Sequence, residues 1–147
     1  MLGGCGPELG PIQRLAAIPE PVLPEVSDPS VVRDGADYYV YGSNNHLRAP
    51  VTHTRDLSRS YSLREKNAIT TNAMPQRPAW AGGSDADQLW APTVHRFGST
   101  WVMFFSMDRP APPQPNNPQC LGRAVASSPL GPFVPDPFPA HCGAEGG

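Results

Sequence analysis

The sequence is poor in the features that mark three large classes of protein. It contains no continuous apolar stretch of the ~18 residues that a membrane-spanning helix requires. Its formal net charge is −2, and its Lys and Arg residues form no cluster of the kind that contacts nucleic acid. Helical spacing of apolar residues is weak, and the one candidate, residues 12–18, is short and ends at Pro19. The sequence therefore predicts no transmembrane helix, no nucleic-acid partner and little helix.

Cysteine is scarce, with three residues and no Cys-x-x-Cys pair, so the sequence does not indicate a zinc site. Cys120 and Cys142 bracket a predicted strand and a Pro-rich return across residues 123–139. A bridge between them would close this loop, and in an exported protein it would contribute roughly 3 kcal/mol to stability. We predict this disulfide; the alternative is two unpaired thiols in a cytosolic protein.

The third cysteine, Cys5, lies in the run Leu2-Gly3-Gly4-Cys5-Gly6. This run resembles the end of a bacterial lipoprotein signal, where small residues precede a Cys that becomes lipidated. The apolar segment that should come before it is missing, which a true start upstream of Met1 would explain; an accidental Gly-rich N-terminus is the alternative. Residues 1–26 are therefore predicted to be a Pro-rich linker or a signal remnant with lipidation at Cys5, and residues 27–147 to be the folded part.

Proline and glycine, in contrast, are abundant, with 20 Pro and 14 Gly among 147 residues. Such a composition approaches the range in which disorder is suspected. The prolines, however, are spread among aromatic segments, so they are interpreted as punctuation between strands. The length is sufficient for one ordinary domain.

A pattern that occurs twice gives the strongest indication of fold. Residues 28–43 and residues 90–106 each contain a Pro, a short apolar strand, a polar turn with Gly and an aromatic-rich strand. A unit that recurs about every 60 residues predicts repeated antiparallel sheets, each a blade of a propeller. Asp28 stands beside the Pro of the first unit, whereas the second unit has no acid beside its Pro.

The sequence predicts about four strands in each unit, and hence an all-β fold. Asp34-Gly35 and Gly98-Ser99 are the expected hairpin turns. In the first unit we expect strands at residues 28–33, 37–43, 51–54 and, at the edge, 60–64. A long connection follows over residues 65–87. In the second unit we expect strands at residues 90–97, 100–106 and 120–127, with an outer edge that begins at residues 131–134.

Four segments carry a resemblance to a known family. They are Asp28-Pro29-Ser30-Val31-Val32, residues 38–43, Trp90-Ala91-Pro92 and residues 124–133, the last with Ser128-Pro129-Leu130-Gly131-Pro132-Phe133. In this order and spacing, from about residue 27 to residue 142, the chain resembles family 43 of the glycoside hydrolases, which are five-bladed β-propellers. The resemblance implies a partial five-bladed propeller, a substrate that is an arabinose- or xylose-containing oligo- or polysaccharide, and no cofactor, although a structural calcium ion is compatible with the family.

The resemblance also implies a mechanism. Inverting glycosidases use one carboxylate to activate water and one carboxylic acid to protonate the leaving oxygen, about 6.5–9.5 Å apart. Asp28 matches the position of the general base; the alternative is an Asp that caps nearby backbone N–H groups. The family's general acid is a Glu of the third blade, and Glu145, in a Gly-rich tail, is not assigned this role.

The chain departs from the family where a third acid normally tunes the pKa of the general acid. After Trp90-Ala91-Pro92 that residue is Thr93, whose hydroxyl cannot supply negative charge. The candidate substitutes are Asp85, Asp87 and Asp108. The absence of the tuning acid favours the alternative function, a non-catalytic propeller that binds carbohydrate or another protein; a remnant without function is a third reading.

Other side chains have two open interpretations. Trp90 either stacks on a sugar ring, which with Thr93 would make it part of the substrate site, or packs in the core, whereas Trp80 and Trp101 are expected to pack. His46 and Arg48 are expected to be solvated loop residues rather than sugar contacts. His95 has no His or carboxylate partner at metal-ligand spacing.

Two blades alone would expose apolar sheet faces, expected to contain Tyr39, Tyr41, Val102 and Phe104. We therefore expect the chain to be a fragment of a longer reading frame. The expected location is extracellular or in the cell envelope, where the disulfide and a lipid anchor would both form.

Overall fold

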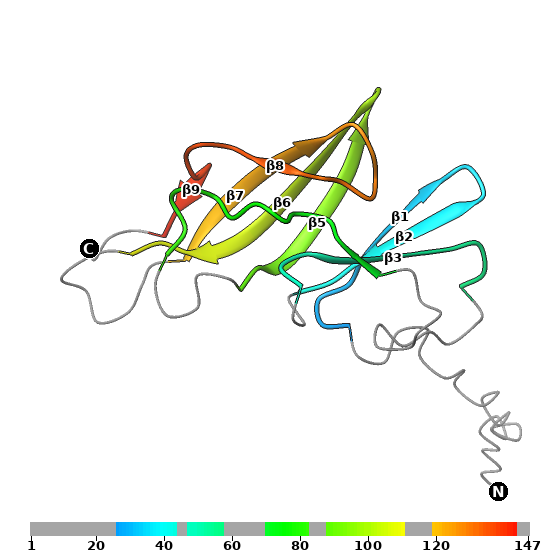
Figure 1. The fold of residues 1–147 in the computed structure, drawn as a ribbon, viewed down its shortest axis with the longest axis horizontal. Helices are drawn as coiled ribbons and strands as arrows, with labels where there is room; N and C mark the ends of the chain where they lie inside the picture. The colour runs from blue at the N-terminus through cyan, green and yellow to red at the C-terminus, as the bar shows by residue number, and fades with distance from the viewer. Residues whose placement is uncertain (1–25, 44–46, 58–69, 83–87, 111–118, 144–147) are drawn as a thin grey trace, which may run out of the picture.

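The computed structural model describes residues 26–43, 47–57, 70–82, 88–110 and 119–143, and these residues form two antiparallel sheets and no helix (Figure 1). The first sheet has the strand order β1-β2-β3-β4, and the second has the order β5-β6-β7-β8, with β9 paired to β7. The predicted all-β class is thus confirmed. The β1–β2 and β5–β6 turns point to the same side of the molecule (Figure 1).

The first sheet is a meander of short strands. Its strands are β1 (Ser30–Asp34), β2 (Asp37–Tyr41), β3 (Pro50–Thr54) and β4 (Thr70–Asn72). Asp34 pairs with Asp37 across the first turn, which Gly35 makes possible with a φ of 63°. The fourth strand lies inside the stretch predicted to be a connection, whereas the predicted strand 60–64 lies outside the described residues. A three-residue strand is too short to show the alternation that identified the others.

The second sheet is longer and contains β5 (Trp90–Phe97), β6 (Thr100–Asp108), β7 (Gln119–Ala126), β8 (Val134–Pro135) and β9 (His141–Cys142). Alternate residues of β6 and β7 are buried, as expected for a sheet with one face in a core. Gly122 is required on that face because a Cβ there would lie 2.4 Å from the ring of Phe105. Phe105 in turn stacks on Trp80, with ring centroids 6.2 Å apart.

The buried face of the second sheet packs against the first sheet, and a segment after β7 fastens the two together. Tyr41, fully buried, donates its hydroxyl proton to the carbonyl oxygen of Pro129 at 2.6 Å, and its ring meets the edge of Phe133. The backbone N–H of Phe133 donates to the carbonyl oxygen of Ala73 at 2.7 Å. Residues 128–133, the most specific of the motifs that carry the resemblance, therefore help to dock one blade on the other.

This docking corrects one expectation. Tyr39 and Tyr41 were expected on an exposed face, but Tyr41 is fully buried, and Tyr39 packs edge-on against Trp101 at 6.0 Å between centroids. The second sheet covers this face of the first. Val102 and Phe104, on the opposite face of β6 from the buried residues, are half-buried.

Candidate functional site

Asp28 lies two residues before the first residue of β1, Ser30, and has an unusual backbone. Its φ is 49°, in the left-handed region that costs a non-glycine residue about 1–2 kcal/mol. The residue is exposed, and its Oδ2 accepts a hydrogen bond from the hydroxyl of Ser43 at 2.7 Å. The carboxylate is thus held by a side-chain hydroxyl, whereas the capping alternative expected backbone N–H donors.

Ser43 and its neighbour Gly42 clamp the segment that carries Asp28. The backbone N–H of Ser43 donates to the carbonyl oxygen of Ser27 at 2.9 Å. A Cβ on Gly42 would lie 2.5 Å from Cγ1 of Val26, so only glycine allows residues 26–28 to cross the end of β2 so closely. The backbone and the carboxylate of this segment are therefore both fixed by the two residues that follow β2.

The second sheet also contacts the hydroxyl group of Ser43. The backbone N–H of Ala91 donates to Oγ of Ser43 at 3.0 Å, and Ala91 has a φ of 47°. Like Asp28, Ala91 directly precedes a proline, where steric clash normally pushes the backbone toward extended conformations. Ala91 lies within the register shift between Trp90 and Thr93 on β5. The two repeats thus each place a strained residue directly before a proline, Asp28 ahead of β1 and Ala91 near the start of β5.

The innermost strands of the two sheets, β1 and β5, are joined by further hydrogen bonds. The backbone N–H of Val94 on β5 donates to Oγ of Ser30 on β1 at 3.2 Å. At the turn ends, Nη1 of Arg96 pairs with the Asp34 carboxylate at 2.5 Å. The strands β1 and β5 therefore lie side by side, which brings the start of β5 next to Asp28.

The predicted substrate residues lie at this end of β5. Trp90 is half-buried and pairs with Ser106, and Thr93 is exposed and pairs with Phe104. Asp108 lies two residues beyond Ser106 on β6, at the same end of the second sheet as Trp90. Its role as a substitute for the tuning acid stays a prediction.

The other aromatic and basic candidates pack against, or hydrogen-bond to, other parts of the protein. Trp101 is 2% exposed, which agrees with its predicted packing role, as does the stacking of Trp80 on Phe105. Arg48 is not a solvated loop residue: its Nη1 donates to the carbonyl oxygens of Met74 at 3.2 Å and Pro75 at 2.6 Å. Arg48 therefore holds the backbone that follows β4 in place through these two carbonyl groups.

Several predicted residues lie outside the described part of the chain: Cys5, His46, Asp85, Asp87 and Glu145. The roles considered for Cys5, His46, Asp85 and Asp87 stay predictions, and Glu145 was assigned none. Within the described residues, no group of three or more His, Cys, Asp or Glu side chains could hold a metal ion, and His95 is exposed beside Phe97. The described residues also contain no helix that is long and apolar enough to cross a membrane.

A charged cluster lies at the end of the first sheet that is far from Asp28, next to the β1–β2 turn. Oδ1 of Asp37 accepts hydrogen bonds from Nε of Arg55 at 2.7 Å and from Nε2 of His53 at 2.8 Å. These two donors, the arginine first, hold the pKa of the Asp37 carboxyl below its usual range. The ring of Tyr39 stacks on His53 at 5.1 Å. The cluster lies where β2 begins, at the turn end, and does not adjoin Asp28.

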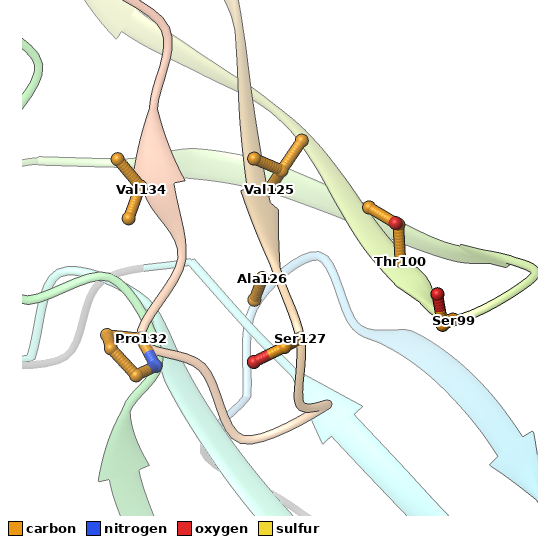
Figure 2. Close-up of a pocket in the computed structure, with 7 residues that line it drawn as sticks. All are labelled: Ser99, Thr100, Val125, Ala126, Ser127, Pro132 and Val134. Carbon is orange, nitrogen blue, oxygen red and sulfur yellow. The ribbon is translucent and has the colours of Figure 1, made fainter.

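A shallow pocket also lies at the turn end, on the second sheet. Figure 2 shows its lining. The residues are Ser99, Thr100, Val125, Ala126, Ser127, Pro132 and Val134. It contains hydroxyl groups and apolar side chains but no carboxylate, imidazole or thiol, so it offers no general acid, base or nucleophile.

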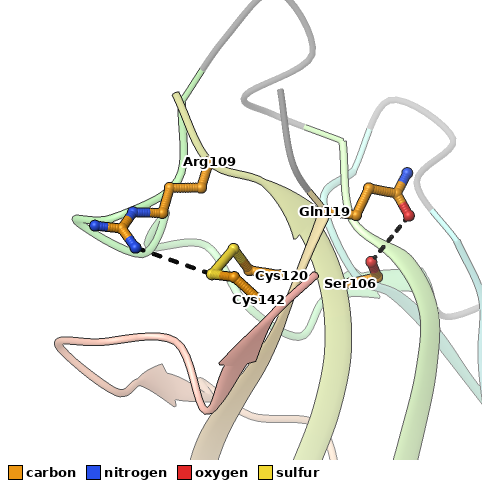
Figure 3. Close-up of a disulfide and its surroundings, with 5 residues drawn as sticks. All are labelled: Ser106, Arg109, Gln119, Cys120 and Cys142. Atoms are coloured by element: carbon orange, nitrogen blue, oxygen red, sulfur yellow. Dashed lines mark hydrogen bonds between the residues drawn. A yellow bond between two sulfur atoms is a disulfide. The ribbon is translucent and has the colours of Figure 1, made fainter. Parts of the chain in front are cut away.

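A disulfide joins Cys120 and Cys142, as predicted (Figure 3). The two residues face each other directly across β7 and β9, with their Cα atoms 4.0 Å apart. Nη1 of Arg109 lies 4.0 Å from Sγ of Cys142. Nearby, the hydroxyl of Ser106 donates to Oε1 of Gln119 at 3.3 Å. The bridge fastens the outer return to the second sheet.

Sequence reasoning did not identify Ser43 as a site residue. One signal was present: in both repeats the aromatic second-strand segment ends in a serine, Ser43 in the first and Ser106 in the second. Only the first of these serines contacts a carboxylate and the neighbouring blade.

Comparison with known proteins supports the fold. The sequence model described as glycosyl hydrolases family 43 matches residues 18–140, most of the chain. No curated protein matches significantly. A solved β-xylosidase/α-arabinofuranosidase from a compost microbial metagenome is 20% identical, with 82% of this chain and 37% of that chain covered and a TM-score of 0.56.

Two further solved structures give similar values. A family 43 enzyme from Xanthomonas citri is 21% identical, with 81% of this chain and 34% of that chain covered and a TM-score of 0.56. An endo-arabinase from Bacteroides thetaiotaomicron is 24% identical, with 78% and 36% covered and a TM-score of 0.56. The chain thus spans roughly a third of the length of these proteins, and at this identity the likeness concerns the fold: part of a β-propeller.

Proposed function

Because the chain belongs to glycosyl hydrolases family 43, we propose that it forms the part of an inverting glycosidase that carries the general base. The proposed substrates are glycans that contain arabinose or xylose. The activities of two similar proteins, a β-xylosidase/α-arabinofuranosidase and an endo-arabinase, support this choice of sugars.

Asp28 is the proposed general base, and one observation carries this proposal. The carboxylate is exposed at the junction of the two inner strands, yet a hydroxyl fixes one of its oxygens. Its other oxygen, Oδ1, would take a proton from a water molecule as that water attacks the anomeric carbon from the face opposite the leaving group. The leaving oxygen would take its proton from a separate carboxylic acid.

That general acid is not among the described residues, none of which is a glutamate. The family assigns the role to a Glu of the third blade, whereas the two described sheets account for two blades. We therefore expect the 147-residue chain by itself to be inactive. We expect hydrolysis from a full-length protein in which this sequence is followed by further blades.

The test measures hydrolysis of arabinan, arabinoxylan and aryl α-L-arabinofuranoside or β-D-xyloside by the full-length protein. Asp28→Asn should lower kcat by about 10²–10⁴-fold, because the proposed base is removed with little change of shape. Asp136→Asn is the matched control, since Asp136 forms a surface ion pair with Arg123 at 2.7 Å. NMR of the first-formed sugar should show inverted anomeric configuration. Retention of the anomeric configuration would refute the mechanism, and so would equal activity of Asp28→Asn and Asp136→Asn.

A non-catalytic carbohydrate- or protein-binding propeller is the second candidate. Thr93 favours it, because an exposed threonine stands where the family has the acid that tunes the general acid. In that case the full-length protein would bind xylan or arabinan without cleaving it, and Asp28→Asn would only weaken binding. Asp85, Asp87 and Asp108 are the candidates to replace the tuning acid if hydrolysis is found.

Export to the cell envelope or the exterior is also proposed. The Cys120–Cys142 bridge supports it, because disulfides persist in oxidising compartments. Lipidation at Cys5 would anchor the protein there. Mass spectrometry of protein from the native cell would show a lipid on Cys5; an unmodified Cys5 would contradict the anchor and leave the glycosidase proposal untouched. The chemistry itself needs water and carboxyl groups, and a structural calcium ion stays a prediction.

A further inference from the structure

A single hydroxyl links the proposed base to the neighbouring blade. Ser43 is 6% exposed, and its Oγ contacts Oδ2 of Asp28 at 2.7 Å and the backbone nitrogen of Ala91 at 3.0 Å. A hydroxyl has one proton and two acceptor lone pairs. Because the N–H of Ala91 can only donate, it occupies a lone pair, and the hydroxyl proton is directed to the carboxylate.

Backbone strain on both sides of this hydroxyl points to a positioning function. Asp28 and Ala91 have φ values of 49° and 47°, and each precedes a proline. Such conformations persist only where the surrounding structure imposes them, and they concentrate at functional sites. Here the two strained residues meet at the same side chain, that of Ser43, which follows the end of β2.

We propose that Ser43 is a positioning residue that holds the carboxylate of Asp28 in its working orientation, with the backbone N–H of Ala91 as its anchor on the second blade. The inference rests on the proposed function, because it gives Asp28 the role of base. Its consequence is that the docking of the second blade on the first sets the orientation of the base. The base would therefore be correctly placed only when the two blades are packed together.

The chain offers a matched control for this role. Ser30 also lies on the first blade, and its Oγ also accepts a backbone N–H of β5, that of Val94, at 3.2 Å. Ser30→Ala and Ser43→Ala therefore each remove one hydroxyl that joins the same two blades. Only Ser43 also donates to the carboxylate of Asp28. A merely structural role predicts similar effects for the two variants.

The experiment compares kcat, KM and the thermal unfolding midpoint of full-length Ser43→Ala, Ser43→Thr, Ser30→Ala and Asp28→Asn. Ser43→Ala should lower kcat on the order of 10- to 100-fold with little change in KM, because a misplaced base slows the chemical step. Ser43→Thr, which keeps the hydroxyl, should restore most of kcat. Ser30→Ala should keep kcat near that of the wild type. If Ser43→Ala does not fold, Ser43→Cys, a weaker donor, should give an intermediate loss.

Each failure has its own signature. If Asp28→Asn abolishes hydrolysis while Ser43→Ala and Ser30→Ala lose equal activity, or neither loses any, the positioning role is refuted and the base survives. A loss of kcat that Ser43→Thr does not restore, or that follows the unfolding midpoint across the variants, refutes the positioning role as well. If the wild type does not hydrolyse these glycans, or Asp28→Asn remains active, the proposed function fails and the inference falls with it.

Discussion

Gly131→Ala tests whether the segment of residues 128–133 docks the two blades. Gly131 has a φ of 84°, and a Cβ there would lie 2.3 Å from the carbonyl oxygen of Ala73. The same carbonyl oxygen accepts the N–H of Phe133 at 2.7 Å, and Phe133 is 1% exposed. Backbone atoms cannot rotate away as side chains do, so the segment must withdraw from the first sheet.

The expected cost has three parts. The left-handed backbone costs an alanine about 1–2 kcal/mol, and loss of the hydrogen bond adds about 1 kcal/mol. Partial exposure of Phe133 adds a share of the roughly 1.5–3 kcal/mol that burial of such a side chain contributes. Gly131→Ala should therefore destabilise the protein by about 3–5 kcal/mol.

Gly98→Ala is the matched control, because Gly98 has a φ of 60° but nothing lies within 4 Å of its added Cβ. It should cost only the backbone strain of about 1–2 kcal/mol. Urea unfolding of the full-length variants, followed by tryptophan fluorescence, measures the shift of the midpoint for each. Equal shifts for the two variants would refute the idea that residues 128–133 dock the blades.

Two further predictions concern pH and the disulfide. The pKa of Asp37 is lowered in the folded state by Arg55 and then by His53, so its contribution to stability is present above the usual aspartate value of 3.8 and is lost as the pH falls through the folded-state pKa. Asp37→Asn should therefore lower the unfolding midpoint at pH 7 and converge with the wild type in strong acid; a difference that persists undiminished at low pH contradicts this. Cys142→Ser opens a bridge with a sequence separation of 22 and should cost roughly 3 kcal/mol in urea unfolding. An unchanged midpoint would mean that the bridge does not constrain the unfolded chain.

Local patterns in the sequence were sufficient to predict many of the strands and turns. The β5 strand runs from Trp90 to Phe97, as predicted, because its turn and its aromatic partner strand are adjacent in sequence. The turn glycines Gly35 and Gly98 both adopt positive φ, as hairpin turns favour. The first turn is shifted by one residue from the predicted Asp34-Gly35 to Gly35-Ala36, because Asp34 pairs with Asp37 and belongs to β1. The family resemblance rested on motifs of this local kind, and the family match over residues 18–140 agrees with it.

The tertiary structure decided what depends on distant segments. Ser43 and Ala91 are 48 residues apart, and Tyr41 and Pro129 are 88 apart. Local patterns in a sequence cannot reveal contacts between such distant residues. For this reason Tyr41 was predicted on an exposed face and Ser43 was not recognised as a site residue. Alternation along a strand shows which residues share a face, but only the packing of the two sheets shows what covers that face. The sequence motif was enough to single out Asp28. Only the tertiary structure shows that the hydroxyl bonded to its carboxylate, that of Ser43, also accepts a backbone N–H from the second blade.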